Sequence, residues 1–565
     1  MTLIFDIETK TFGMPDPTKD EFKYLGAYSY EEDEYYFLSD KAEIKALFKK
    51  HRVLVSFNGY HYDEPILKRS GLWNSHCRHL DLRVIIKKRA NLLGCVYESK
   101  SLSNLAKFFK LEVGKGELDY DLLKKDFNTP EELKLIKEYT LQDIKVTKEM
   151  FDYVHDFFEP FKEYMNRIQV RRYEWLTTTI ASYTYKVFCN KCNLKEEYAD
   201  KYERVDYEGG YVSEPSVDEA HRKIICFDFS SLYPFDIIQN NLVTKDKYKL
   251  GKIEQTLLDF YKQRLKYKSV GDRREYVIKI IINSFYGMLG SPIFQSVHNY
   301  EAAKACTKLG RSYVKHARKL FKDFGYEVLY TDTDSVYIRY HYPQTKQTAE
   351  QVADVIVKQL QVDMPFPSDL FKLKVDDEIK HIYFFKHGDK RLKKLYIYVT
   401  EEDKIVVKGL PMIKNDSSKI GYEVFKNIIQ DRLITGERYI TETELKTEAL
   451  RLLNKNINYA KRVFYVRGNY KNDTQLQARI EKRHGIGRHE LIGNNKIGVG
   501  CSTKYCTETE FREHNLTVED INLNKFWKEM NFFLEEPHVE KKLRTNNRTK
   551  QTKEQKTLMQ WGGIK

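Results

Sequence analysis

Four carboxylates and one tyrosine near the start of the chain have the residue types and order of a site that hydrolyses phosphate esters. They are Asp6, Glu8, Asp63, Tyr139 and Asp143. Oxygen ligands of this kind select Mg²⁺ or Mn²⁺, and two such ions about 4 Å apart can activate a water and stabilise a leaving oxygen. Each acid alone is typical of a solvated surface residue. The ordered set predicts a two-metal site in which the tyrosine orients the water.

Three further acids and a row of polar helix residues form a second set. The acids are Asp228, Asp332 and Asp334. The helix residues are Arg264, Lys268, Lys279, Asn283 and Tyr286. Spacings of four and seven place the last three on one helix face and the first two on another. Taken alone, the acids are typical of a charged hairpin turn and the cations of a solvated helix face. Together they suit a triphosphate chelated to metal.

Two predicted strands position the acids at the start of the chain. Residues 2–7 form an apolar strand that carries Asp6 and leads to Glu8, and residues two apart on a strand point to the same side. Residues 53–57 form a second apolar strand, and an Asn-Gly turn follows it. We therefore expect Asp63 to begin the next helix.

Helical periodicity positions the other residues of the first set and the cations of the second. Apolar residues at helical spacing predict a helix around residues 133–144, with Tyr139 and Asp143 on one face. Two further helices are predicted at about 251–268 and 273–289. The cations of the second set therefore lie on a pair of consecutive helices.

Strands and turns position the acids of the second set. Residues 224–234 are predicted to form a buried strand that ends in a turn, with Asp228 near the strand's end. Residues 326–330 and 335–338 are two strand-like runs that flank residues 331–334. This pattern predicts a hairpin with two acids at its tip.

The composition is that of a multidomain globular protein. The 565 residues predict roughly three to four domains, and 41% hydrophobic residues exclude wholesale disorder. A net charge of +14 with 41 Tyr fits a polyanionic partner with surfaces for stacking. No apolar run approaches the ~18 residues of a membrane span, and the N-terminus is unlike a signal peptide. Eight scattered Cys favour an intracellular, reducing compartment.

Eight motifs, all in family order, resemble those of family B DNA polymerases with a 3′–5′ proofreading exonuclease. The exonuclease motifs are Asp6-x-Glu8, Asn58-x₃-Tyr62-Asp63 and Tyr139-x₃-Asp143. The polymerase motifs are Asp228-x₂-Ser231-Leu232-Tyr233-Pro234, Lys279-x₃-Asn283-Ser284-x-Tyr286-Gly287 and Tyr330-x-Asp332-Thr333-Asp334-Ser335. Tyr207-Glu208-Gly209-Gly210 resembles the linker motif between the two activities, and Lys394-Leu395-Tyr396 a motif that grips the primer. The motifs extend from residue 6 to residue 396, well over half of the chain.

The resemblance implies an α/β multidomain fold: an RNase H-like exonuclease and a right-hand polymerase with an antiparallel-sheet palm, short helical fingers and a mainly helical thumb. The expected parts are the exonuclease at 1–155, a connector at 156–215, the palm at 216–250 and 290–410, the fingers at 251–289, the thumb at 411–538 and a flexible tail at 539–565. The chain would extend a primer 3′-OH with dNTPs on a template and proofread the product. It would be an intracellular monomer that does not associate with a membrane.

The resemblance also implies roles for individual residues. The metal ligands would be Asp228, Asp332 and Asp334 at one site and Asp6, Glu8, Asp63 and Asp143 at the other, with two Mg²⁺ at each and Mn²⁺ able to substitute. The dNTP contacts would be Ser231, Leu232, Tyr233, Arg264, Lys268, Lys279, Asn283 and Tyr286, with Tyr233 under the sugar to exclude a 2′-OH. The DNA contacts would be Asn58, Tyr207, Gly209, Gly210, Lys394 and Tyr396.

The spacing between motifs departs from that of some family members. Only 51 residues separate Asp228 from Lys279, and 53 separate Lys279 from Asp332. The long insertions of protein-primed members would not fit, so priming from an ordinary 3′-OH is expected and strand displacement without helpers is in doubt. Five residues precede Asp6, which predicts that the N-terminal domain of large members is absent. The small size favours the replicase of a virus or mobile element. We expect it to act in the cytoplasm of a prokaryotic host, or wherever the virus or mobile element replicates.

The region beyond residue 410 carries weaker signals. Residues 418–435 and 442–463 are predicted amphipathic helices, with Ser417 or Ser418 as a cap for the first. The Gly-rich segment at 485–500 is either a phosphate-contacting loop or a mobile surface loop. In the tail, the residues Gln555, Leu558 and Trp561 resemble a sliding-clamp-binding peptide on a flexible tether. The alternative is a disordered tail with incidental apolar residues.

Three other functions remain as alternatives. A protein-primed polymerase is disfavoured by the missing insertions. A clamp-tethered nuclease with a decayed polymerase half is disfavoured by the intact acids of the second set. A non-catalytic DNA-binding protein is disfavoured because both predicted metal sites keep all their acids. Cys189 and Cys192 have the spacing of half a zinc site, but no second pair lies near them in sequence, which disfavours a metal site.

Overall fold

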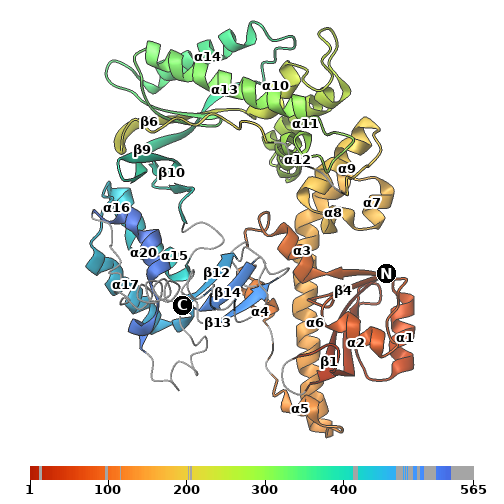
Figure 1. The fold of residues 1–565 in the computed structure, drawn as a ribbon. Coiled ribbons are helices and arrows are strands. Elements are labelled where there is room, and N and C mark those ends of the chain that lie inside the picture. The colour runs from red at the N-terminus through yellow and green to blue at the C-terminus, as the bar shows by residue number, and fades with distance from the viewer. Residues whose placement is uncertain are drawn as a thin grey trace, which may run out of the picture. The chain divides into compact units, whose positions relative to one another are not determined.

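The structure is a computed structural model, and it forms two compact units. It describes residues 1–11, 15–95, 100–114, 116, 118–200, 203, 206–411, 418–465, 475, 478, 480, 488–492, 497–501 and 517–535. Unit 1 comprises Met1–Tyr211, Phe229–Ala317 and Ala353–Lys374. Unit 2 comprises Val212–Asp228, Arg318–Val352 and Val375–Lys565. Figure 1 labels their helices and strands. The predicted clamp peptide, Gln555, Leu558 and Trp561, lies outside the described residues.

A five-stranded sheet forms the N-terminal part of unit 1 (Figure 1). Its order is β3-β2-β1-β4-β5, in which β4 runs parallel to both of its neighbours and the other pairs are antiparallel. The strands are β1 (Thr2–Lys10), β2 (Glu21–Ser29), β3 (Glu34–Leu38), β4 (Val53–Ser56) and β5 (Arg78–Asp81). Both strands predicted here are confirmed, and β1 continues past residue 7, so Glu8 lies within the strand rather than after it.

Helices cover this sheet, and one of them approaches it very closely. Leu3, Phe5 and Ile7 of β1 pack in a core with α1 (Lys41–Lys50) and α2 (Asp63–Arg69). Another helix, α6 (Pro130–Phe158), approaches β2 at Gly26, where a Cβ atom would lie 2.5 Å from Cγ2 of Thr140. No larger side chain fits there, so glycine permits the close contact of helix and strand.

The remaining elements of unit 1 are helical and include the two helices predicted for the fingers. They are α3 (Leu82–Arg89), α4 (Leu102–Phe108), α5 (Asp121–Lys124), α7 (Arg167–Arg171), α8 (Glu174–Thr177), α9 (Ile180–Cys192), α10 (Leu232–Gln239), α11 (Lys252–Ser269) and α12 (Arg274–Leu289). Helices α13 (Tyr300–Asp323) and α14 (Lys346–Gln361) have residues in both units. The prediction of two helices at 251–268 and 273–289 is confirmed. The turn predicted after the strand of Asp228 is shorter than expected, because Leu232–Pro234 already belong to α10.

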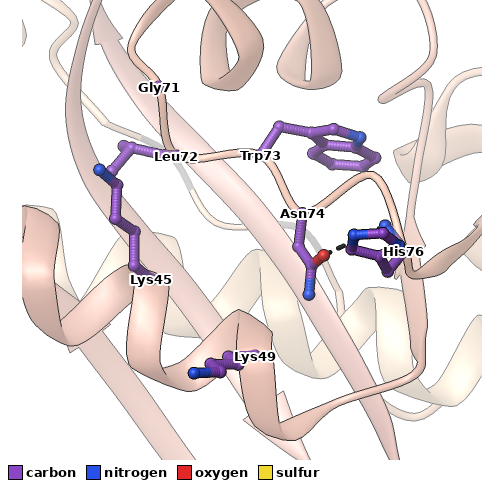
Figure 2. A pocket seen from close by; sticks show the side chains of 7 residues that line it. All are labelled: Lys45, Lys49, Gly71, Leu72, Trp73, Asn74 and His76. Carbon is purple, nitrogen blue, oxygen red and sulfur yellow. Dashed lines mark hydrogen bonds between the residues drawn. The ribbon is translucent and has the colours of Figure 1, made fainter.

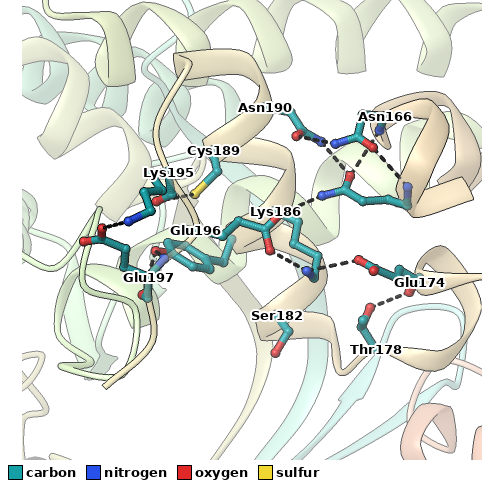
Figure 3. A network of polar contacts seen from close by, with 12 residues as sticks. Asn166, Glu174, Thr178, Ser182, Lys186, Cys189, Asn190, Lys195, Glu196 and Glu197 are labelled. Atoms are coloured by element: carbon teal, nitrogen blue, oxygen red, sulfur yellow. Dashed lines mark hydrogen bonds and ion pairs between the residues drawn. The ribbon is translucent and has the colours of Figure 1, made fainter. Parts of the chain in front are cut away.

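A polar network ties α9 to the segments on either side of it (Figure 3). The Nζ atom of Lys186 lies 3.0 Å from Glu174 and 2.5 Å from Glu196. Cys189, on the same helix, is buried, and burial raises the pKa of its thiol to about 11. The Sγ atoms of Cys189 and Cys192 lie 3.9 Å from the backbone carbonyls of Lys195 and Lys252. Both thiols therefore contact backbone and favour the protonated form.

Unit 2 is built on a six-stranded sheet of order β11-β10-β9-β6-β8-β7. All of its pairs with a recorded register are antiparallel, as the predicted palm requires. The strands are β6 (Glu219–Phe229), β7 (Glu327–Asp332), β8 (Ser335–Arg339), β9 (Leu373–His387), β10 (Lys390–Thr400) and β11 (Ile405–Lys408). The predicted hairpin of β7 and β8 is confirmed, with Thr333 and Asp334 between its strands.

The C-terminal part of unit 2 is helical, with an additional small sheet. Its helices are α15 (Lys419–Val424), which continues through a π-helical turn into α16 (Gln430–Thr435), α17 (Glu442–Lys455) and α20 (Asn524–Met530). The helix predicted at 442–463 ends at Lys455, and a 3-10 turn (Ile457–Ala460) and β12 (Lys461–Tyr465) follow it. This strand, β14 (Ile497–Cys501) and β13 (Arg488–Ile492) form an antiparallel sheet that the sequence did not predict. The Gly-rich segment is thus partly strand.

A buried carboxylate ties α20 to α15. Glu529 is fully buried and accepts hydrogen bonds from the backbone N–H of Ser418 at 2.9 Å and from its hydroxyl. Ser418 also caps α15 by accepting a hydrogen bond from Gly421, which confirms one of the two predicted caps. Within the described residues, no helix combines the length and apolar character that crossing a bilayer requires.

One buried acid in unit 1 has no hydrogen-bond partner among the described residues. Asp236 of α10 is 0% exposed, and neither of its carboxylate oxygens is bonded. Burial raises the pKa of this carboxyl well above its ordinary value, so the neutral acid is the form that the fold accommodates.

We therefore predict that Asp236→Asn makes the protein relatively more stable as pH rises. A raised pKa in the folded state adds stability that is complete below the ordinary pKa and is lost as pH rises through the folded pKa. The variant has no carboxyl group at residue 236 and therefore cannot lose this contribution. Its free energy of unfolding, relative to that of the parent protein, should therefore increase by up to ~1.4 kcal/mol per pH unit. Denaturant unfolding of both proteins from pH 5 to 8 measures the difference. Parallel curves would contradict the prediction, and Asp259→Asn, at an exposed position on α11, is the matched control.

Candidate active sites

The acids of the first set lie together on the sheet and helices of unit 1. Asp6 and Glu8 are on the same face of β1, opposite the apolar core face. The pKa of Asp63 is raised well above its ordinary value, first by burial and then by the charges of Asp6, Asp81 and Glu8. These carboxylates are therefore close enough to repel one another. Asp63 begins α2, as predicted.

Helix α6 adds the other two predicted residues. The hydroxyl of Thr140 donates a 3.1 Å hydrogen bond to Glu8, which holds α6 against β1. The neighbouring Tyr139 and Asp143 are buried on this helix. Burial raises the pKa of Tyr139, and a hydrogen bond with Tyr120 and the charges of Asp143 and Glu8 add to the rise. The structure thus brings all five residues of the first set together.

A turn between β4 and α2 positions Asp63. Asp81, at the end of β5, accepts hydrogen bonds of 3.1 Å from the backbone N–H groups of Asn58 and Tyr60. Asn58 has a positive φ of 70° and its side chain accepts a 2.6 Å hydrogen bond from Arg83. Sequence reasoning missed Asp81, because no motif spacing relates it to the other acids. Tyr62, the residue before Asp63, points its hydroxyl at Thr9 and Asp20, at distances of 2.7 and 2.6 Å.

Sequence reasoning also missed Tyr120. Its hydroxyl lies 3.0 Å from the hydroxyl of Tyr139, and the two rings meet edge to face. The exposed fraction of Tyr120 is 57%, so the tyrosine pair extends from the buried acids to solvent. An exposed tyrosine in a polar stretch carries no sequence signal for such a contact.

The acids of the second set lie on neighbouring strands of the unit 2 sheet. Asp228 of β6 is directly opposite Ser335 of β8, whose hydroxyl donates a 2.8 Å hydrogen bond to it. The same hydroxyl lies 3.5 Å from Asp334. Burial and the charge of Asp334 raise the pKa of Asp228 to about 7, and burial also raises the pKa of Asp334. Asp228 and Asp334 thus form a repelling pair.

Asp332 has different surroundings from the other two acids. The Nζ atom of Lys394 lies 3.6 Å from one of its oxygens, and the hydroxyl of Tyr396 donates a 3.3 Å hydrogen bond to the other. The backbone N–H of Lys394 is held in turn by the hydroxyl of Tyr330 at 2.8 Å. Gly409, with φ of +71°, approaches so closely that a Cβ atom would lie 1.8 Å from the carbonyl oxygen of Lys394. The predicted primer-gripping residues therefore contact Asp332.

The predicted nucleotide-binding residues of unit 1 are grouped around α10 and the fingers helices. The ring of Tyr233 lies against the ring of Tyr286, with their centroids 4.5 Å apart. The hydroxyl of Tyr286 lies 3.1 Å from that of Tyr207, the first residue of the linker motif. Arg311 of α13 donates hydrogen bonds to the carbonyls of Glu208 and Gly209, at 2.6 and 2.8 Å. The linker backbone is thus anchored beside Tyr207, which contacts this pair of tilted tyrosine rings.

The predicted phosphate-binding residues of α11 and α12 differ in whether they are exposed or already paired within the protein. Arg264 of α11 forms a 2.7 Å ion pair with Glu275 of α12, so it connects the two helices. Lys268, Lys279 and Asn283 are exposed. The sequence could not reveal the ion pair, because Glu275 lies outside every motif. Ser231, with a positive φ of 52°, precedes α10, and Leu232 is buried.

The carboxylate clusters suit hard divalent cations. Their donors are oxygens only, partly buried and repelling, and a bound cation would offset that repulsion. Within the described part of the chain, no three His, Cys, Asp or Glu side chains converge closely enough to enclose a metal ion. The chemistry of the donors, rather than a preformed cage, is therefore what fits such an ion.

A separate pocket in unit 1 contains none of the predicted site residues. It has a volume of about 430 Å³ and lies between α1 and the loop after α2 (Figure 2). Lys45, Lys49, Trp73, Asn74 and His76 line it, with Gly71 and Leu72. Trp73 packs on Phe5, whose side chain belongs to the core face of β1. The pocket is therefore on the side of the strand away from Asp6 and Glu8.

Two family models match this chain. Residues 252–479 match DNA polymerase family B, and residues 3–155 match the RNase H superfamily. The chain is 24% identical over 495 residues to a DNA polymerase of Archaeoglobus fulgidus, covering 76% of this chain and 59% of the relative. It is 28% identical over 413 residues to a DNA polymerase of Thermococcus gorgonarius, covering 64% and 49%. It thus spans about half the length of these relatives.

A solved structure has the same fold. The family B DNA polymerase of the hyperthermophilic archaeon Pyrobaculum calidifontis superposes with a TM-score of 0.52 and 17% identity, covering 88% of this chain and 72% of that one. The RNase H-like part and the polymerase fold predicted from the motifs are confirmed. The chain is therefore similar to DNA polymerase family B over residues 252–479 and to the RNase H superfamily over residues 3–155.

Proposed function

We propose that this chain is a template-directed DNA polymerase that extends a primer 3′-OH with dNTPs and proofreads with a 3′–5′ exonuclease. The observation that carries the proposal is the presence of two separate carboxylate clusters, one inside the RNase H superfamily match and one that includes Asp334 of the family B match. Asp6, Glu8 and Asp63 form the first, and Asp228 and Asp334 form the second. Primer–template DNA and dNTPs are the substrates, and the proposed location is intracellular.

Both domains belong to families that generally use divalent metals. We propose Mg²⁺, two at each site, with Mn²⁺ as a substitute. When bound, these ions would lower the pKa of the attacking hydroxyl or water and offset charge on the phosphate. Asp228 and Asp334 would hold them at the polymerase site, and Asp6, Glu8, Asp63 and Asp143 at the exonuclease site. Asp332 would stay beside the polymerase site, since Lys394 and Tyr396 already hold it.

The other residues would bind and orient the substrates. Lys268 and Lys279 are exposed and would bind the triphosphate, while Arg264 would join them or keep the fingers helices paired through Glu275. Tyr233 would lie under the sugar, where its ring excludes a 2′-OH. In the exonuclease, the hydroxyl of Tyr139 would orient the attacking water. Gln555, Leu558 and Trp561 are proposed to bind a sliding clamp.

A primer-extension gel tests the proposed function. A 5′-labelled primer annealed to a longer template should lengthen with Mg²⁺ and dNTPs and shorten with Mg²⁺ alone. EDTA should stop both reactions. Shortening in every lane would contradict the polymerase assignment, and an unchanged primer in every lane would contradict both.

Asp334→Ala should abolish synthesis and spare degradation, while Asp6→Ala with Glu8→Ala should do the reverse. Loss of a metal ligand should cost more than the 10- to 100-fold that is typical of outer-shell partners, so a fall above about 100-fold is expected at the altered site. The same gel measures both rates. Asp389→Ala, at an exposed position between β9 and β10, is the control. If either change stopped both reactions in a folded protein, the two-site model would be wrong.

Tyr120→Phe should slow the exonuclease and leave polymerisation unchanged. The variant keeps the ring but removes the hydroxyl that lies 3.0 Å from Tyr139, so Tyr139 loses a partner that fixes its hydroxyl. A lost hydrogen bond of ~0.5–1.5 kcal/mol corresponds to roughly a 2- to 13-fold lower rate. Single-turnover shortening of a labelled primer measures it. Tyr153→Phe, at an exposed position on α6, is the control, and equal rates for the two variants would refute the role of Tyr120.

A further inference from the structure

Helix α13 approaches α10 at Gly310, where there is little room for a side chain. A Cβ atom at Gly310 would lie 3.1 Å from Cε1 of Tyr233, 3.2 Å from Oδ2 of Asp236 and 3.3 Å from Cδ2 of Leu232. Real Cβ contacts are rarely this short, so a methyl group there would displace one of these neighbours by a few tenths of an ångström. Gly310 lies outside every motif that the sequence analysis identified.

The ring of Tyr233 is the neighbour that can move. Leu232 and Asp236 are 2% and 0% exposed, so the surrounding core holds both. Tyr233 is only half-buried. Its backbone is held, because the Sγ atom of Cys306, one turn before Gly310 on α13, contacts its carbonyl oxygen at 3.5 Å. A displacement would therefore be taken up by rotation of the tyrosine side chain.

The ring of Tyr233 also contacts α12, one of the two helices predicted for the fingers. It lies against Tyr286, which is itself joined to Tyr207 through their hydroxyls. Tyr207 is confined in turn, since a Cβ atom at Gly290 would lie 2.5 Å from its hydroxyl oxygen. The position of the Tyr233 ring thus depends on Gly310 of α13 and on this chain of tyrosines.

We propose that Gly310 is a specificity-determining residue of the polymerase. Its missing side chain sets how close the Tyr233 ring lies to α13, and hence how much space is left for the sugar of the incoming nucleotide. The inference rests on the proposed function, in which Tyr233 lies under that sugar. A methyl group at residue 310 would push the ring away from α13 into the space for the sugar.

Gly310→Ala should therefore raise the KM for dATP about fivefold or more, and the KM for ATP further. This expected effect is smaller than the ~10- to 200-fold effect of one methylene in a binding pocket, because the new methyl acts through a ring that can turn. The kcat for dATP should change by less than about threefold. Single-nucleotide insertion on a primer–template, in the Asp6→Ala/Glu8→Ala background that leaves the primer intact, measures these constants.

A double-mutant cycle separates this role from a general effect on packing. With Tyr233→Ala there is no ring to displace, so adding Gly310→Ala should leave KM unchanged within about twofold. With Tyr233→Phe the ring remains, and Gly310→Ala should keep its full effect. Ser312→Ala, at an exposed position on α13, is the control for the helix itself and should leave both constants unchanged.

The outcomes are distinguishable. If the parent protein inserts no nucleotide, the proposed function fails and the inference fails with it. If the parent inserts dATP but Gly310→Ala raises KM equally with and without the ring, the inference alone is overturned. If Gly310→Ala by itself does not fold, the inference requires Tyr233→Ala to restore its folding, and failure of this rescue overturns it.

Discussion

Carboxylates held near one another and partly out of water repel, and both candidate sites are built around this repulsion. Asp63 has a raised pKa because it is buried beside Asp6, Asp81 and Glu8, and Asp228 has one because it is buried beside Asp334. Such arrangements cost folding free energy unless a cation or proton offsets the charge. The fold maintains them through backbone geometry that does not depend on the acids themselves.

Close backbone contacts supply that geometry. At Gly26 a strand comes so near α6 that no side chain fits, and the same contact holds Thr140 against Glu8. In unit 2, antiparallel pairing places Asp228 opposite Ser335, next to the hairpin that carries Asp334. Secondary structure thus fixes the acids before any metal binds, and the surrounding packing offsets the energetic cost.

Local patterns allowed much of this to be predicted from the sequence. The strand of Asp6, the helix that begins at Asp63 and the fingers helices follow from periodicity and turn residues within short windows. Contacts between distant segments carry no such pattern. Asp81 reaches the turn before Asp63 from the end of β5, and Tyr120 reaches Tyr139 from an exposed polar stretch. The pairing of β12 with β14 was missed because a long segment of the chain separates the two strands.

Three acids that look equivalent in the sequence are made different by their neighbours. Asp332 and Asp334 are two residues apart at one hairpin tip, yet Lys394 and Tyr396 contact only Asp332. The cation and the hydroxyl offset the charge of Asp332, while Asp334 is left to face Asp228. An acid whose charge is already compensated has less to gain from a metal ion than one that repels its neighbour. The difference between the surroundings of Asp332 and Asp334 therefore comes from β10, more than fifty residues later in the chain.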